Sequence, residues 1–187
     1  MASGKEQLIR HARRSASRLA GALVLVATMT PAYADIAEDH VKAIKMWEIG
    51  NVVDAMTQLT ATAEKGYAPS QVWLATIMDQ AQQDEDAVKW FRKAADQGEA
   101  AGEYGLGLMY AKGEGIKQDY AKALEYVTRA AEKDYSDAVF ALAAVYAQGG
   151  YGMQPNAEKA EFWNARAKAL APKEEPRQES GKKKRRK

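Results

Sequence analysis

The chain has 187 residues, 47% of them hydrophobic, which is enough for one domain with a buried core. It contains no cysteine, which excludes disulfides, thiolate zinc sites and cysteine nucleophiles, and its two histidines are His11 and His40. The formal net charge of +2 hides an acidic body, because residues 35–172 hold 14 Lys and Arg against 21 Asp and Glu, so we expect no nucleic acid partner for this body.

Residues 1–34 have the organisation of a secretory signal peptide. Basic residues precede an apolar run of eleven at residues 19–29, and Ala32-Tyr33-Ala34 follows as a cleavage signature. The run is too short for a transmembrane helix, which needs about 20 residues. We therefore expect export, with the periplasm favoured over secretion, and cleavage after Ala34. An uncleaved anchor and a mitochondrial-type presequence are the alternatives.

After residue 35 the chain repeats itself. Alanines recur 32, 36 and 37 residues apart at Ala55, Ala87, Ala123 and Ala160. Inside each unit the apolar residues follow the helical spacing of three and four, and no stretch alternates with the period of a strand. Units of this length that share a core predict an α/α solenoid.

The units predict four helix pairs, at 37–49 with 52–65, 68–80 with 84–97, 100–112 with 119–133, and 136–148 with 156–171. Gly66 and Gly98 are predicted to end second helices as C-caps, and Pro172 to stop the last helix. The predicted organisation is a signal peptide at 1–34, a repeat domain at 35–172 with units near 37–66, 67–98, 99–135 and 136–171, and a disordered basic tail at 173–187.

The third unit carries a specific signature in residues 100–134, AAGEYGLGLMYAKGEGIKQDYAKALEYVTRAAEKD. This segment closely resembles the Sel-one-like repeat, a relative of the tetratricopeptide repeat. The matching positions are Leu106, Gly107, Tyr110, Gly113, Gly115, Ile116, Asp119, Lys122, Ala123, Tyr126, Ala130 and Ala131. The fourth unit matches well, whereas the first two lack the G-x-G loop and look more like ordinary tetratricopeptide units.

The resemblance implies an all-α, right-handed superhelix and a non-enzymatic scaffold for protein–protein interaction in the bacterial cell envelope, in assembly, motility or signalling. It implies no catalytic residue, cofactor, metal or small-molecule substrate. Some repeat proteins of this kind are described as β-lactamases, but those are rich in cysteine, which this chain lacks. A hydrolase is therefore the weaker alternative.

The expected partner is another protein or a peptide, bound on the concave face of the first helices. Trp73 stands just before the signature leucine, where the repeat usually has a small or polar residue. By analogy with tetratricopeptide ligand sites, the candidate face comprises Trp73, Thr76, Glu103, Leu108, Ala141 and Ala144. Simple packing between repeats is the alternative role for Trp73.

Other chemistry-bearing residues receive structural interpretations. His40 is expected at the surface without a catalytic partner. Asp84, Glu85 and Asp86 are expected to cap a helix, because neighbouring helical residues point about 100° apart and do not converge on a metal. Six aromatic residues on repeat positions are expected in the core: Trp47, Trp90, Tyr110, Tyr126, Tyr146 and Trp163.

The tail ends in six consecutive basic residues, Lys182, Lys183, Lys184, Arg185, Arg186 and Lys187. Such a run can bind an anionic membrane surface or another polyanion, or it can serve only solubility. A membrane-surface or polyanion binder is therefore the alternative to the scaffold.

Overall fold

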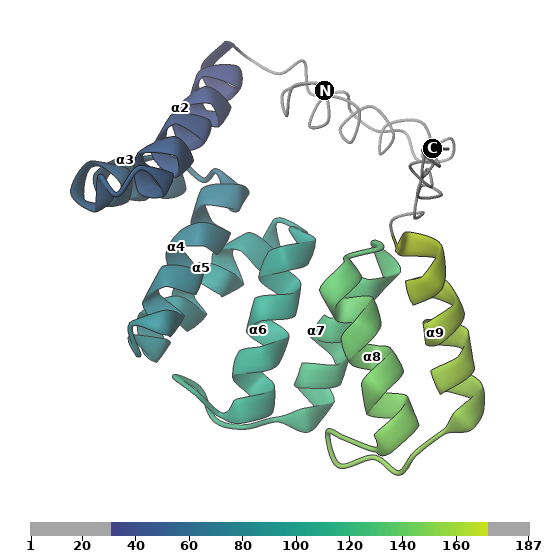
Figure 1. Cartoon of the computed structure of the whole chain (residues 1–187). Coiled ribbons are helices and arrows are strands. Elements are labelled where there is room, and N and C mark those ends of the chain that lie inside the picture. The colour runs from purple at the N-terminus through teal and green to yellow at the C-terminus, as the bar shows by residue number, and fades with distance from the viewer. Residues whose placement is uncertain (1–30, 172–187) are drawn as a thin grey trace, which may run out of the picture. The chain divides into compact units, whose positions relative to one another are not determined.

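The computed structural model describes residues 31–171, and every regular element in this range is a helix (Figure 1). The helices are α2 (Pro31–Glu48), α3 (Val52–Glu64), α4 (Ala68–Gln80), α5 (Asp84–Asp96), α6 (Ala100–Lys112), α7 (Tyr120–Glu132), α8 (Ser136–Gln148) and α9 (Ala157–Leu170). The predicted all-α class is confirmed, and the predicted helix boundaries, except the start of the first helix, lie within one residue of the observed ones. Most of the predicted signal peptide, and all of the basic tail, lie outside the described residues.

The first helix differs most from its prediction, since α2 begins at Pro31 rather than at residue 37. Proline is favoured in the first turn of a helix because its missing N–H needs no partner there, and the alanines that follow are good helix formers. The predicted cleavage point after Ala34 therefore falls inside α2. None of the described helices is long and apolar enough to cross a bilayer.

The chain divides into two compact units, Met1–Asp35 and Ile36–Lys187. In the second unit the helices form pairs joined by short turns, with α4 against α5, α6 against α7 and α8 against α9. Successive pairs also pack on each other through α3 with α4, α5 with α6, and α7 with α8 (Figure 1). This serial packing is that of a solenoid, in which each repeat buries its apolar face against its neighbours.

Glycines end the second helices as predicted. Gly66, after α3, has a φ of 90°, and its N–H donates to the carbonyl of Ala63, while the N–H of Tyr67 donates to the carbonyl of Thr62. These two bonds form a Schellman motif, which satisfies carbonyls that the helix leaves free. The left-handed backbone is open to glycine at no steric cost. Gly98 repeats the arrangement after α5.

Gly107 allows the two helices of the third pair to approach closely. A Cβ atom at this position would lie 2.8 Å from Cγ2 of Val127 and 3.2 Å from the carbonyl oxygen of Ala123, both on α7. The buried core is correspondingly rich in alanine, with Leu106 and Val127 among its larger members. Close helix contact through small residues thus explains the alanine period of the sequence.

Candidate functional site

The candidate site is an apolar groove between the end of α2 and one side of α4. Its cavity has a volume of about 310 Å³ and is lined by Trp47, Val72, Trp73, Thr76, Ile77 and Gln80. Both tryptophans are half-buried, so each has one part packed against the protein and another open to solvent. A concave apolar surface with two rigid aromatic rings has the properties of a protein-binding hot spot.

Trp73 occupies a repeat position that is used differently in α6. Spacing from the signature leucine places Gly105 at the same position, and a Cβ atom there would overlap the ring of Phe91 on the preceding helix. The position therefore faces the preceding pair. In α4 the larger indole occupies this position and lines the groove together with Trp47 of α2.

Trp47 corrects one prediction from the sequence. The sequence predicts Trp47, Trp90 and Tyr126 in the core, but the structure leaves all three half-buried. Of these three, Trp47 lines the groove. Tyr110, Tyr146 and Trp163 are buried as predicted. Trp47 lies just before the turn between α2 and α3, and no signal within its own helix distinguishes a core position from this one.

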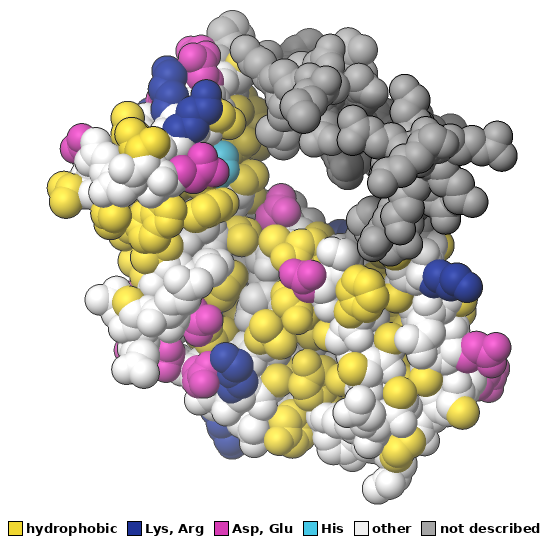
Figure 2. Space-filling view, in the orientation of Figure 1, with side chains coloured by type: hydrophobic (Ala, Val, Ile, Leu, Met, Phe, Trp, Pro, Cys, Tyr) yellow, Lys and Arg dark blue, Asp and Glu magenta, His cyan; other side chains and the backbone are white. Residues whose placement is uncertain are grey.

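Of the other predicted residues, Thr76 lines the cavity with Trp73, and three residues of later helices lie outside its lining. These are Leu108 of α6 and Ala141 of α8, which are half-buried, and Ala144 of α8, which is exposed. Figure 2 shows hydrophobic side chains gathered over α6 and α8, with few Lys or Arg among them. Leu108, Ala141 and Ala144 are thus apolar residues of the first helices that lie outside the cavity lining.

Glu103 is a correction, because it is fully buried and unavailable to a partner. Its Oε2 accepts a 2.7 Å hydrogen bond from Nζ of Lys133, which also donates to the carbonyl of Gly98 at 2.7 Å. Its Oε1 lies 2.7 Å from Nη2 of Arg129, within ion-pair distance but outside hydrogen-bond geometry. The Glu103 side chain thus links α6 to the C-terminal end of α7, and Lys133 in turn links this end to the turn before α6.

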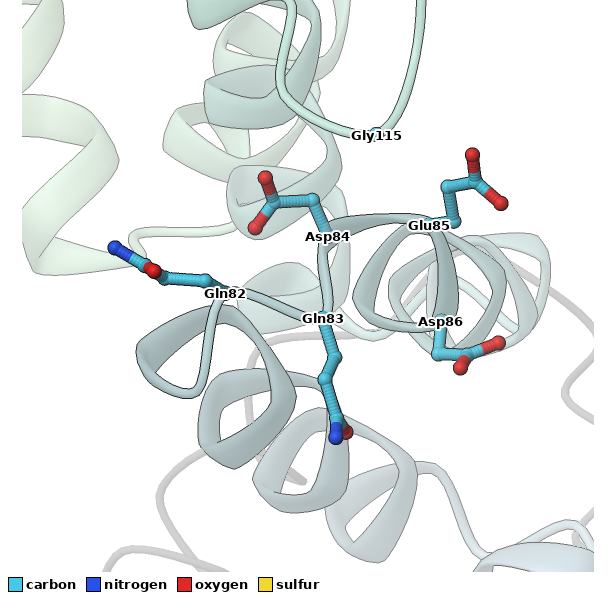
Figure 3. Close-up of a pocket in the computed structure, with 6 residues that line it drawn as sticks. All are labelled: Gln82, Gln83, Asp84, Glu85, Asp86 and Gly115. Carbon is cyan, nitrogen blue, oxygen red and sulfur yellow. The ribbon is translucent and has the colours of Figure 1, made fainter.

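The three successive carboxylates mark a second cavity, of about 470 Å³, lined by Gln82, Gln83, Asp84, Glu85, Asp86 and Gly115. Figure 3 shows the carboxylates of Asp84, Glu85 and Asp86 pointing in different directions. Among residues 31–171 no group of three His, Cys, Asp or Glu is arranged to hold a metal ion.

The helix-capping role predicted for these carboxylates is corrected in detail. The residue that precedes α5 is Gln83, and its side chain makes no capping hydrogen bond. Asp84, Glu85 and Asp86 occupy the first turn, so their negative charge acts on the positive end of the helix dipole.

His40 is less exposed than predicted. Its Nδ1 lies 2.9 Å from Oγ of Ser70, and Ser70 in turn lies 2.6 Å from Oγ1 of Thr62. The histidine ring packs on Tyr67 at a centroid distance of 5.3 Å, and burial lowers the pKa of His40. Because Ser70 and Thr62 are fully buried, substrate has no access to the serine hydroxyl, and the pair ties α2 to α4.

The geometry defines the class of protein as a helical-repeat solenoid with an apolar groove. The sequence model of the Sel1 repeat family matches residues 79–99, 100–135 and 136–170. The chain is therefore a Sel1 repeat protein, and proteins of this family are in general scaffolds for protein–protein interaction. The first pair, which supplies Trp47, lies outside the matched residues.

Two solved structures resemble the chain. A Sel1 repeat protein from Oxalobacter formigenes is 27% identical with a TM-score of 0.63, over 71% of this chain and 54% of that one. A protective antigen of uropathogenic Escherichia coli with the same repeat fold is 25% identical with a TM-score of 0.61, over 74% of this chain and 34% of that one. The shared architecture confirms the predicted solenoid.

Among curated proteins, an uncharacterised protein of Neisseria meningitidis serogroup B is 27% identical over 117 residues, which are 63% of this chain and 25% of that protein. The chain thus spans about a quarter of this relative, and no more than about half of either solved relative.

Proposed function

We propose that the protein is an exported, non-enzymatic scaffold that binds another protein or a peptide in the groove at Trp47 and Trp73. The observation that carries the proposal is this groove itself, in which two half-buried indole rings from different repeats line one cavity of about 310 Å³. Aromatic rings held by packing lose little entropy on binding, and for this reason they dominate the energy of protein interfaces. The general role of the Sel1 repeat family in protein–protein interaction supports it further.

A site-specific crosslink tests the binding face directly. A photoreactive amino acid replaces Thr76, which is exposed in the groove, and in a second variant it replaces Glu125, which is exposed on α7. In intact cells the Thr76 position is expected to give a discrete adduct with another protein that the Glu125 position does not give. Equal adducts from both positions, or none from Thr76, refute the proposed face.

A double substitution provides the matching loss of function. Trp73→Glu with Leu108→Glu places two charges on the apolar face, and folding is checked by the helical circular dichroism spectrum. The folded variant is expected to lose the adduct formed at Thr76. Undiminished binding by this variant would count against the groove.

Export is the second part of the proposal and rests on the organisation of residues 1–34. Cell fractionation is expected to recover the protein outside the cytoplasm, with Asp35 as the first residue found by N-terminal sequencing. Removal of residues 1–34 is expected to retain it in the cytoplasm. An N-terminus at Met1 in the exported fraction supports a retained anchor instead.

The basic tail carries an alternative function, attachment to an anionic surface through residues 182–187. Co-sedimentation with vesicles of anionic lipid, for the full chain and for a chain ending at Pro172, measures this contribution. Binding by the tail is expected to fall as salt rises, because exposed charges are screened. Equal binding by both chains excludes the tail as the attachment.

A further inference from the structure

Two tyrosines and two carboxylates form a surface where the third and fourth helix pairs meet. The rings of Tyr104, on α6, and Tyr135, directly before α8, have centroids 5.5 Å apart, and both side chains are half-buried. The hydroxyl of Tyr135 donates to Oδ2 of the exposed Asp137 at 3.4 Å. Burial raises the pKa of Tyr135 to about 12, with further contributions from Asp137 and from Glu99, so both acids lie close to this hydroxyl. These four residues are called the tyrosine face below.

The tyrosine face is negative. Neither Glu99 nor Asp137 forms an ion pair with any residue in the described part of the chain. None of the groups that shift the pKa of Tyr135 is a cation. Two unpaired carboxylates beside two tyrosine rings therefore offer a surface for a positively charged group.

The cations around the tyrosine face already have partners or lie elsewhere. Nζ of Lys133 is held at 2.7 Å by the buried carboxylate of Glu103. Nε of Arg166 is held at 2.7 Å by Asp134. Lys168 is exposed at a position of α9 that would face a following pair, away from α8. None of these side chains neutralises the face.

Other aromatic rings of the chain carry a cation of their own. Five of the described rings have a Lys or Arg at 3.9–5.6 Å from the ring centroid: Trp90 with Lys93, Tyr110 with Lys122, Tyr126 with Arg129, Tyr146 with Lys159, and Trp163 with Arg166. Such a cation is attracted by the negative face of the ring. Within residues 31–171 no Lys or Arg lies over Tyr104 or Tyr135. The tyrosine face thus lacks the cation that these five rings have.

The end of α9 lies against the turn that carries the tyrosine face. Arg166 donates from Nε to Oδ1 of Asp134 at 2.7 Å and from Nη2 to the carbonyl of Glu132 at 2.9 Å. Asp134 directly precedes Tyr135, so the last turns of α9 and the start of α8 are side by side (Figure 1). Ala171 follows Arg166 by five residues, about 7.5 Å along a helix axis. The chain therefore leaves the described residues beside this face.

The segment that follows is basic and long enough to reach the tyrosine face. Residues 173–187 hold eight Lys and Arg against three Glu, and the last six residues are all basic. From Ala171 to Lys182 an extended chain reaches up to roughly 36 Å. A tether of this kind gives an effective concentration on the order of millimolar, so a weak contact is enough to hold the segment.

We propose that the basic tail, residues 173–187, binds the tyrosine face of its own chain, with Lys or Arg side chains on the rings of Tyr104 and Tyr135 and beside the carboxylates. The rings attract an ammonium or guanidinium group, and the two acids add an attraction that salt screens. An anionic membrane surface needs the same basic side chains, so the two attachments exclude each other. The proposal goes beyond the groove at Trp47 and Trp73 and does not depend on it.

Two other arrangements fit less well. The tail of a second copy has the same chemistry but lacks the tether, so it would need a protein concentration near millimolar to compete. The acids Asp84, Glu85 and Asp86 are a second negative surface, but no aromatic ring lines their cavity, and Asp86 pairs with Lys89 at 2.8 Å.

Paramagnetic broadening of amide signals tests the contact in the full chain. Because the chain has no cysteine, Ser180→Cys gives a single attachment point for a nitroxide label next to the basic run. Amide signals of residues 135–137 are expected to lose at least half of their intensity at low salt, whereas those of residues 84–86 keep theirs. In about 0.5 M NaCl, where the Debye length is only a few ångströms, the lost intensity is expected to return.

Matched variants identify the residues responsible. Glu99→Gln with Asp137→Asn removes both charges at nearly constant shape and is expected to restore most of the lost intensity. Glu85→Gln with Glu125→Gln changes the net charge equally at exposed acids elsewhere and is expected to leave the broadening unchanged.

The same two variants test the competition with a membrane surface by co-sedimentation with vesicles of anionic lipid. Glu99→Gln with Asp137→Asn is expected to bind about two- to fivefold more tightly than the control variant. This is the gain for a tail that is docked for about half to four-fifths of the time and is then set free.

Several outcomes overturn the proposal. Unbroadened signals at residues 135–137, or broadening that neither salt nor Glu99→Gln with Asp137→Asn reduces, reject the contact. Stronger broadening at residues 84–86 assigns the tail to the other acidic surface instead. Broadening of ¹⁵N-labelled chain by spin-labelled chain without ¹⁵N, in a mixed sample, makes the tail of a second copy the occupant. Equal vesicle affinities for the two variants reject the competition.

Discussion

Glu103 offers the sharpest test of how the repeats are held together. Its carboxylate is fully buried, yet its two cationic partners, Arg129 and Lys133, have side chains that are 44% and 41% exposed. The perturbation is Glu103→Gln, which keeps the shape of the side chain and removes its charge. We expect this change to destabilise the fold much more than removal of a surface charge.

The magnitude follows from the exposure of the two partners. Breaking a fully buried ion pair from one side costs about 3–5 kcal/mol, because the remaining charge stays buried. Here Arg129 and Lys133 can rehydrate, so the expected cost of Glu103→Gln is lower, about 2–3 kcal/mol. For a chain of this size that corresponds to a fall in melting temperature of roughly 5–10 °C.

The control is the exposed pair of Asp86 with Lys89, whose atoms are 2.8 Å apart and whose side chains are 54% and 66% exposed. Asp86→Asn is expected to cost less than about 1 kcal/mol. Urea unfolding followed by circular dichroism gives both free energies of unfolding, provided that the m-values agree. A cost for Glu103→Gln no larger than that for Asp86→Asn refutes the account of the buried carboxylate.

Four further variants test the backbone conformation and the burial of single residues. Gln82 follows α4 with a φ of 59°, so Gln82→Gly is expected to raise the free energy of unfolding by about 1 kcal/mol. Gly66 has a φ of 90° and open space around it, so Gly66→Ala is expected to lower the free energy of unfolding by about the same amount. Urea midpoints that move in the opposite directions contradict this reasoning. Gly107→Ala is expected to cost about 1–3 kcal/mol in urea unfolding, because the added methyl group meets Val127, and an unchanged midpoint would show that α7 shifts freely. Burial lowers the pKa of His40 below 6.5, so the folded state binds fewer protons than the unfolded state, and the free energy of unfolding is expected to fall as the pH drops below that value. The fall is expected to be smaller in His40→Gln. Equal slopes of the free energy of unfolding against pH, from about pH 7.5 to 5.5, in wild type and His40→Gln exclude His40 as the cause.

The fold was predictable because packing between the repeats requires particular residue types at single positions. Ala123 and Ala160 recur at positions where helices touch, and Gly66 and Gly98 stand where the backbone must turn left-handed. Such positions tolerate few side chains, so the sequence period reports them directly. The start of α2 was not predicted, because Ala32-Tyr33-Ala34 after Pro31 can begin a helix and also matches the pattern of a cleavage site.

The site was predictable only in part, since contacts between different helices are not encoded by the spacing within one helix. Trp73 was identified because it breaks the repeat pattern, and Thr76 lies beside it. Trp47 follows the pattern, so its place in the groove emerged only with the structure. Glu103 was misjudged because an acidic residue reads as exposed unless its partners, here Arg129 and Lys133 some thirty residues on, are known.

The second helices differ from one another at the positions that would face a following pair. Three repeat positions that face the next pair are apolar in the inner helices, with Val88, Phe91 and Ala95 on α5 and Leu124, Val127 and Ala131 on α7. The same positions of α9 carry Glu161, Asn164 and Lys168, all exposed. At these three positions α9 therefore offers no apolar side chain to a further repeat, as in a capping repeat, although Phe162 elsewhere on the same helix is exposed. Since the apolar residues at these three positions of α5 and α7 serve the stack itself, the groove at Trp47 and Trp73 is better placed than the α9 end to receive a partner.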